Sequence, residues 1–349
     1  MTCLHRDYRN TSLETMFREL TNSPDLYQPS LFWQSLNSVH VNQLLDSGFD
    51  NFKRTVNMRY FNWRTLGIIR HQSQIIINEI MKGNFSPIIK SRFVTPQQTT
   101  KKVKQFNILT ALLYRLYIAS FFDYLITMDR LKILDTVKEP AIGNPFMIKY
   151  KGETLSQDLC NSIHEFYSIV NSLTIIPTRI GELGAGYGRL AYIFLKMYPT
   201  ASYCIIDIPP ALYIAQKYLA KVFPNENIFF FRRFTSFNTV KRQFNNARIV
   251  FLLPHQIELL PKNYFNLTIN ISSLHEMTRL QIKNYLLQIN RLTSGYFYTK
   301  QWVKSRTKDN DFITDTEYPI PTSWKMLYKH KPHPVQKMFF DALYQTRLK

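Results

Sequence analysis

The feature of the sequence best suited to chemistry is a glycine cluster at residues 181–188, Gly-Glu-Leu-Gly-Ala-Gly-Tyr-Gly. The chain of 349 residues has only ten glycines, and four of them lie within these eight residues. The cluster follows an apolar run that predicts a strand and precedes a run that predicts a helix. Glycines at such a junction let the backbone turn tightly and approach a ligand closely, while the first turn of the helix offers free N–H groups. The alternative is an ordinary tight turn between a strand and a helix.

The spacing of the glycines separates two kinds of cofactor site. A dinucleotide-binding loop, G-x-G-x-x-G/A, needs a small residue at its sixth position, where this chain has Arg189. The pattern is instead acidic-x-G-x-G-x-G, formed by Glu182, Gly184, Gly186 and Gly188. It resembles motif I of class I S-adenosylmethionine-dependent methyltransferases. That resemblance implies a loop that wraps the methionine end of this cofactor.

An acidic residue ends the next predicted strand, where residues 203–207 are Tyr-Cys-Ile-Ile-Asp. The carboxylate of Asp207 would accept hydrogen bonds from ribose hydroxyls. NAD-binding proteins share such a residue, so Asp207 indicates a Rossmann-like sheet and only the loop favours the methyltransferase. The following strand of that fold commonly ends near the adenine. Here it precedes Pro254-His255-Gln256, which makes Gln256 a candidate adenine contact, with a polar loop residue as the alternative.

A histidine and a glutamate follow the fourth predicted strand, in Asn-Ile-Ser-Ser-Leu-His-Glu-Met at residues 270–277. Ligands of open parallel sheets lie at the carboxyl ends of the strands, so this segment should face the transferred group. Methyl transfer to a hydroxyl needs a base that takes the proton. His275 is the candidate base, and Glu276 would orient it or act in its place. We expect turnover to rise with pH through the titration of His275, unless this histidine only caps the next helix.

Five segments together resemble the sugar O-methyltransferase family of bacterial surface-polysaccharide gene clusters. They are Phe-Lys-Arg-Thr at 52–55, Ser-Gln-Asp-Leu at 156–159, Asp-Ile-Pro-Pro-Ala-Leu at 207–212, Ser-Leu-His-Glu-Met at 273–277 and Tyr-Pro-Ile-Pro at 318–321. The resemblance covers residues 29–344. It implies S-adenosyl-L-methionine as cofactor, His275 as general base, and a sugar hydroxyl of a nucleotide-activated sugar or surface glycan as acceptor. Lys53 and Arg54 are candidate acceptor contacts.

The charge of the chain is compatible with an anionic partner. There are 44 Lys and Arg against 24 Asp and Glu, a net charge of +20, spread over both halves. A phosphate-bearing sugar, a nucleic acid or a membrane surface would suit it, although a solvated basic surface explains it equally simply. Methylation of duplex nucleic acid would need a base-flipping pocket that is not evident, so we expect no stable nucleic-acid partner. The alternatives are a methyltransferase for another small molecule or nucleic acid, and a non-catalytic cofactor-binding scaffold in glycan assembly. A homo-oligomer fits each of these.

The predicted elements change in rhythm near residue 150. Helical spacing of apolar residues predicts helices over residues 12–20, 29–37, 64–82 and 108–131. Strands are then expected at 179–183, 202–206, 227–231, 249–253, 264–271 and 296–302, and helices at 156–172, 190–197, 211–222 and 278–292. Alternating strands and helices imply a parallel sheet covered on both faces. We therefore predict an α/β, Rossmann-like class I methyltransferase domain over residues 150–349. A mainly helical N-terminal domain, residues 1–149, would cover the acceptor site or mediate oligomerisation.

The remaining composition indicates a cytoplasmic protein. Cys3, Cys160 and Cys204 form no CxxC pair and have no zinc-ligand spacing, so neither a disulfide framework nor a zinc site is expected. No cluster of Asp, Glu and His suggests another metal. Residues 1–10 lack the apolar core of a secretory signal. The longest apolar stretch, residues 110–128, contains Arg115 and Asp123, which favours a buried or amphipathic helix over a membrane span.

Overall fold

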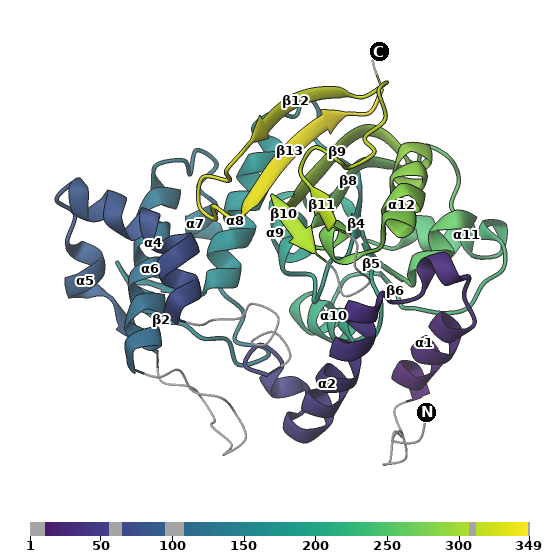
Figure 1. Ribbon diagram of the computed structural model, residues 1–349. Helices are drawn as coiled ribbons and strands as arrows, with labels where there is room; N and C mark the ends of the chain where they lie inside the picture. Colours follow the sequence, from purple (N-terminus) through teal and green to yellow (C-terminus); the bar gives the residue numbers. More distant parts are fainter. Residues whose placement is uncertain (1–10, 56–64, 95–107, 307–311, 348–349) are drawn as a thin grey trace.

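The computed structural model describes residues 11–55, 65–94, 108–306 and 312–347. Two predictions fall at least partly outside this range. They are the absence of a secretory signal in residues 1–10 and the start of a helix at Arg64. The described part has helices around a large central sheet, with most of the N-terminal helices set to one side of it (Figure 1). This arrangement confirms the predicted α/β class.

The central sheet has eight strands in the order β12-β13-β9-β8-β4-β5-β7-β6. Their bounds are β4 Arg179–Leu183, β5 Ser202–Ile206, β6 Ile228–Phe229, β7 Ile249–Leu252, β8 Phe265–Ile271, β9 Thr293–Trp302, β12 Lys325–His330 and β13 Phe339–Gln345. The six strands from β4 to β9 are parallel to one another, whereas β13 is antiparallel to both β9 and β12. The predicted strands therefore form the expected parallel sheet, and the antiparallel edge of β12 and β13 was not predicted.

Helices cover both faces of the sheet because successive strand residues point to opposite sides. Tyr203 and Ile205 of β5 belong to one apolar cluster, and Cys204 and Ile206 belong to another. The first cluster includes buried residues of α8 (Gln157–Val170), α9 (Arg189–Met197) and α10 (Ala211–Val222). The second includes residues of α11 (Phe237–Asn246) and α12 (Arg279–Leu292). Coverage on both faces confirms the Rossmann-like fold.

The order of the strands places a crevice between β4 and β8. The chain passes from β4 through α9 on one face to β5, and from β8 through α12 on the other face to β9. Helices that leave neighbouring strands to opposite faces separate the two loops, and ligands of such sheets bind in the gap. The carboxyl ends of β4, β5 and β8 are therefore where a site is expected.

The part before residue 150 is mainly helical. Its elements are α1 Thr11–Thr21, η1 Asp25–Tyr27, α2 Leu31–Ser47, η2 Phe49–Asn51, α4 Thr65–Met81, α5 Ser86–Lys90, β1 Arg92–Phe93, α6 Ile108–Ile126 and α7 Ile133–Thr136. The strands β1, β2 (Ile148–Tyr150) and β3 (Glu153–Leu155) form a small sheet across residue 150. The first apolar cluster also includes residues of α1, α4 and α6, so the core is continuous across the predicted domain border.

Helix α6 is the apolar stretch that the sequence analysis considered. By length and composition alone it could cross a membrane, and it is the one described helix that meets this criterion. Ten of its residues are nevertheless buried within the protein. Asp123 pairs with Lys151, and Arg115 donates to the carbonyl of Ser91, so both charged side chains of α6 have partners inside the molecule.

Candidate functional site

The glycine loop lies at the end of β4 and has a left-handed backbone. Gly184, Gly186 and Gly188 have φ values of +71°, +59° and +82°, which residues with a Cβ adopt at a cost. A Cβ on Gly184 would lie 2.2 Å from Ser273 Oγ, whereas one on Gly186 would meet open space. The Gly184 N–H donates to the Ile206 carbonyl at 2.8 Å, which ties the loop to the end of β5. Glycine is required here for both conformation and space.

Asp207 stands directly beside this loop. Its Oδ2 accepts a hydrogen bond from the Gly186 N–H at 2.6 Å, and its Oδ1 accepts one from the Ile208 N–H at 2.7 Å. Burial raises the pKa of Asp207 from 3.8 to about 7, although the two backbone donors act in the opposite direction. A carboxylate oxygen can accept more than one hydrogen bond, so both oxygens can still accept from a ligand.

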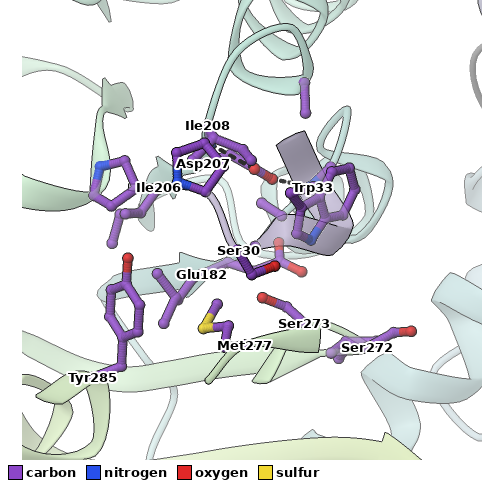
Figure 2. A pocket seen from close by; sticks show the side chains of 18 of the residues that line it. Ser30, Trp33, Glu182, Ile206, Asp207, Ile208, Ser272, Ser273, Met277 and Tyr285 are labelled. Carbon is purple, nitrogen blue, oxygen red and sulfur yellow. Dashed lines mark hydrogen bonds between the residues drawn. The ribbon is translucent and has the colours of Figure 1, made fainter. Parts of the chain in front are cut away.

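A cavity of about 140 Å³ lies where the loop and Asp207 meet. One water needs roughly 10–15 Å³ measured in this way, so the cavity can admit a ligand much larger than water. Figure 2 shows Asp207 on one side of the cavity and Ser272, Ser273 and Met277 across from it. These residues follow β5 and β8, so the cavity occupies the crevice that the strand order predicts.

A second carboxylate, that of Glu182, reaches the cavity from within β4. It is almost fully buried, and its Oε2 accepts a hydrogen bond from the Tyr203 hydroxyl at 2.7 Å. Burial raises the pKa of Glu182 to about 8, against the lowering effects of Tyr203 and Arg189. The structure thus brings together Glu182, Gly184, Gly186 and Asp207 in one cavity wall. Gly188 begins α9 just beyond them.

Arg189 follows the loop and turns its guanidinium towards α8. It donates to both carboxylate oxygens of Glu165, at 2.5 and 3.0 Å, and Lys300 of β9 donates to Glu165 Oε1 at 3.0 Å. Burial alone would raise the pKa of Glu165, but Arg189 and Lys300 lower it to about 2. This buried triad joins α8, α9 and β9 behind the loop. In dinucleotide sites a small residue at this position lets the helix pack closely on the strand. In this chain Arg189 occupies that position.

His275 lies in the short helix η4, Leu274–Glu276, and is 1% exposed. Its ring stacks on Trp302, with centroids 4.7 Å apart, and its Nδ1 lies 2.9 Å from Gln301 Oε1. Burial lowers the pKa of His275 to about 4, so the ring is neutral at pH 7.

The network around Gln301 decides which nitrogen of His275 carries the proton. Gln301 Nε2 donates to the carbonyl and to the Oδ1 of Asn270, at 3.1 and 2.6 Å, so its Oε1 faces the histidine as an acceptor. The Nδ1 must then be protonated, since this contact is much shorter than the 3.5 Å between Nδ1 and the Trp302 N–H. Nε2 is left with its lone pair. It has no hydrogen-bond partner and lies 3.7 Å from Glu276 Oε1.

Glu276 connects His275 to the rim of the cavity. Its Oε2 accepts a hydrogen bond from the Trp33 indole at 3.1 Å, and its carbonyl accepts one from the Ser30 hydroxyl at 2.8 Å. Ser30 and Trp33 line the cavity, whereas His275 and Glu276 do not. The two predicted catalytic residues therefore lie side by side immediately behind the cavity wall, between its lining residues Ser273 and Met277.

Three predicted contacts lie elsewhere. Lys53 is buried in an ion pair with Glu139 at 2.6 Å. Arg54 stacks on the Phe146 ring and donates to backbone carbonyls. Gln256 accepts from the Leu253 N–H and donates to the Arg232 carbonyl, which closes the turn after β7. None of the three lines the cavity, because their polar groups are used in packing the chain, and we do not retain them as ligand contacts.

The sequence analysis missed the N-terminal part of the site. Tyr27 of η1, Ser30 just before α2 and Trp33 of α2 form one side of the cavity, and Tyr285 of α12 contributes another side chain. The Gln281 amide donates to the Gln28 carbonyl at 2.7 Å and fixes this turn against α12. A proline-bounded segment of aromatic and hydroxyl residues was the only signal in the sequence, and it is common in ordinary loops.

Among the residues that the structure describes, no three His, Cys, Asp or Glu side chains are grouped closely enough to hold a metal ion. No family model and no curated protein matches this sequence.

Solved structures that resemble the chain share only its fold. A protein from Pyrococcus horikoshii is 12% identical, with 54% of this chain and 92% of that chain covered and a TM-score of 0.38. The 1,6-didemethyltoxoflavin-N1-methyltransferase of Burkholderia thailandensis, solved with S-adenosylhomocysteine, is 14% identical, with 55% and 79% covered and a TM-score of 0.38. A SAM-dependent methyltransferase from Aquifex aeolicus is 12% identical, with 48% and 82% covered and a TM-score of 0.29. Identities of 12–14% indicate a shared fold but not, by themselves, a shared function.

Proposed function

We propose that this protein is an S-adenosylmethionine-dependent methyltransferase. The observation that carries the proposal is the cavity in which a left-handed glycine loop after β4 meets the half-buried carboxylate of Asp207 after β5. The loop has the acidic-x-G-x-G-x-G pattern, and Arg189 is paired with Glu165 where a dinucleotide site needs a small residue. Both features favour this cofactor over NAD.

The residues present suit the cofactor chemically. Asp207 would accept hydrogen bonds from ribose hydroxyls, since its two oxygens have acceptor capacity left and it lines the cavity. Gly184 and Gly186 would let the backbone approach the methionine end, because a Cβ on Gly186 would project into open space. Asp207, once ionised, would also favour a cationic group in this cavity, whereas Glu182, with its pKa raised to about 8, is mostly neutral at pH 7. When bound, the cofactor supplies a methyl group on a positively charged sulfur.

We propose further that the acceptor group is a hydroxyl and that the pair His275 and Glu276 takes its proton. The neutral ring of His275 has its Nδ1 proton held by Gln301, so its Nε2 is ready to accept a proton. Glu276 lies between this nitrogen and the cavity-lining residues Ser30 and Trp33. A proton that leaves the cavity would therefore reach His275 through or beside Glu276.

A sugar hydroxyl, on a nucleotide-activated sugar or a surface glycan, is the acceptor that we propose. The support is the resemblance of five segments to the sugar O-methyltransferase family, together with a net charge of +20 that suits a phosphate-bearing acceptor. The indole of Trp33 gives the cavity rim an aromatic face next to hydrogen-bonding side chains, a combination that fits an amphipathic ring.

The test is transfer of a labelled methyl group from S-adenosylmethionine to nucleotide sugars and to cell-surface glycan. Mass spectrometry of the glycan from cells with and without the protein would locate the methyl group. We expect label in a sugar with the wild type and much less with Asp207→Ala when the cofactor is below saturation. Label on a non-sugar acceptor would refute the sugar assignment, and cofactor binding with no transfer to any acceptor would favour a non-catalytic scaffold.

A further inference from the structure

The described surface has a group of exposed apolar side chains far from the cavity. It lies at the end of α4, on α5 and on β1, and we call it the α5 tip. Its apolar members are Met81 (81% exposed), Phe85 (51%), Ile88 (41%), Ile89 (76%) and Phe93 (41%). Figure 1 shows α5 at the edge of the molecule, on the opposite side of the helical region from the central sheet. Apolar groups gathered in this way on a surface mark an interaction site.

The α5 tip is held in place by its buried side. Pro87 and Ser91 are buried, and the Ser91 carbonyl accepts a hydrogen bond from Arg115 of α6 at 3.1 Å. Asn84 donates to Glu79 and to Asp123, which fixes the turn between α4 and α5. Ile88 and Ile89 are therefore exposed on a turn whose opposite side is anchored to the protein.

The exposed charges of the tip are all of one sign. Lys90 and Arg92 are exposed between the apolar residues, and residues 80–94 contain no Asp or Glu. Lys82 is also exposed, but it pairs with Glu79 at 2.8 Å, and the Glu79 and Asp123 carboxylates beneath the tip are buried. Apolar side chains interspersed with Lys and Arg are complementary to a surface that is apolar inside and anionic outside.

We propose that the α5 tip binds peripherally to the surface of an anionic lipid bilayer. Ile88 and Ile89 would enter the boundary between head groups and acyl chains, and Lys90 and Arg92 would contact the lipid phosphates. The tip does not include the cavity, so this inference is independent of the proposed reaction. Binding would hold the protein close to acceptors that are themselves attached to a membrane.

The experiment is co-sedimentation of the full chain with phosphatidylcholine vesicles made with and without phosphatidylglycerol. The variant Ile88→Glu/Ile89→Glu places two carboxylates on the tip. The matched control is Ile175→Glu/Ile176→Glu, because Ile175 and Ile176 are also adjacent and exposed (44% and 66%) but lie between Thr174 and Pro177. Melting temperature and affinity for S-adenosylhomocysteine, compared with the wild type, show that both variants fold.

We expect the wild type and the control to bind vesicles that contain phosphatidylglycerol, with about tenfold weaker binding to phosphatidylcholine alone. Ile88→Glu/Ile89→Glu should lose at least about tenfold in affinity. Equal binding by the tip variant and the wild type, equal losses in both variants, or no binding by the wild type would overturn the proposal. A wild-type dimer in light scattering that the tip variant converts to a monomer would assign the tip to self-association instead.

Discussion

Asp207 should make cofactor affinity depend on pH near neutrality. Burial raises the pKa of Asp207 to about 7, so the ligand-free protein holds a proton on this group below that pH. A ligand that donates hydrogen bonds requires the carboxylate, and the proton must leave first. We predict that the Kd for S-adenosylhomocysteine rises about tenfold per pH unit as the pH falls from 7 to 5. Calorimetric titrations across this range measure it.

The control for this prediction is Asp207→Asn. The amide keeps the shape of the side chain but cannot be deprotonated, so its affinity should be weaker and independent of pH. Titration of groups on the ligand itself changes the Kd of the wild type and of the variant equally. A wild-type Kd that is as flat as that of the variant would exclude Asp207 from direct contact with the ligand.

His275 should leave turnover flat between pH 6 and 8. Its pKa is lowered by burial from 6.5 to about 4, so the neutral form that accepts a proton is present throughout this range. The rise with pH that the sequence suggested assumed an exposed imidazole. Replacement by His275→Ala should reduce kcat by about 10²–10⁴-fold, the usual yield of general base catalysis. Affinity for S-adenosylhomocysteine should not change, because His275 does not line the cavity.

Initial rates and calorimetry on His275→Ala and Glu276→Gln separate the two roles. If Glu276→Gln abolishes turnover and His275→Ala does not, Glu276 is the base and His275 orients it. Normal turnover in both variants would mean that the proton leaves to another group.

The roles of individual residues were predictable where the local sequence pattern determines them. The glycines and Asp207 follow buried strands, and their position in the sheet fixed their place in the cavity. That Lys53, Arg54 and Gln256 use their polar groups within the chain was not predictable, because their partners are distant or are backbone groups. The partner of Lys53 is Glu139, 86 residues away, and no local pattern announces it. The pKa of His275 depends on its burial and on its contact with Gln301, and burial of the ring against Trp302 and Gln301 of β9 could not be read from the local sequence.

At the scale of elements, the loop after β4 should tolerate no side chain at its first glycine. Gly184 and Gly83 have φ values of +71° and +74°, but a Cβ would meet Ser273 Oγ at 2.2 Å in the first case and nothing within 4 Å in the second. Both alanine variants lose roughly 1–2 kcal/mol from the left-handed backbone. Gly184→Ala should lose more and also bind S-adenosylhomocysteine more weakly. Urea unfolding and calorimetry measure the two effects, and equal stability losses would show that the loop relaxes around the Cβ.

The triad of Glu165, Arg189 and Lys300 should be the most sensitive link between elements. Glu165→Gln leaves two buried cations without their carboxylate, so we predict a loss of about 3–5 kcal/mol in unfolding free energy at pH 7. The comparison is Asp50→Asn, whose partner Lys221 is 3.5 Å away and whose side chain is 87% exposed. Exposed pairs contribute about 0–1 kcal/mol. A similar loss of unfolding free energy in both variants, measured by urea unfolding, would mean that the triad stabilises the fold no more than an exposed ion pair does.

The bounds of β4, β5 and α10 agree with the prediction residue for residue, because Gly184 follows β4, Asp207 follows β5 and Pro210 precedes α10. Helix α11 was not predicted, since its ten residues are mostly polar and only Phe237, Val240 and Phe244 are buried. The strand β13 forms because it pairs with β9 and β12, and that antiparallel register is a tertiary property.

At the scale of the whole molecule, the site is assembled from both ends of the chain. Ser30 bonds to Glu276 across 246 positions of sequence, and Tyr27 bonds to Glu258 across 231. These contacts bring the N-terminal region to the cavity. That this region covers the acceptor site remains a proposal. Because the apolar core is continuous across residue 150, we do not expect residues 1–149 and 150–349 to fold independently.

The central claim is that the cavity between β4, β5 and β8 binds S-adenosylmethionine. Calorimetric titration of the purified chain with S-adenosylmethionine, S-adenosylhomocysteine and NAD tests it most directly. We predict one site per chain for the first two ligands, no measurable heat with NAD, and a loss of about 1.5–3 kcal/mol in binding free energy in Asp207→Ala. Tight binding of NAD with no response to S-adenosylmethionine would contradict the account.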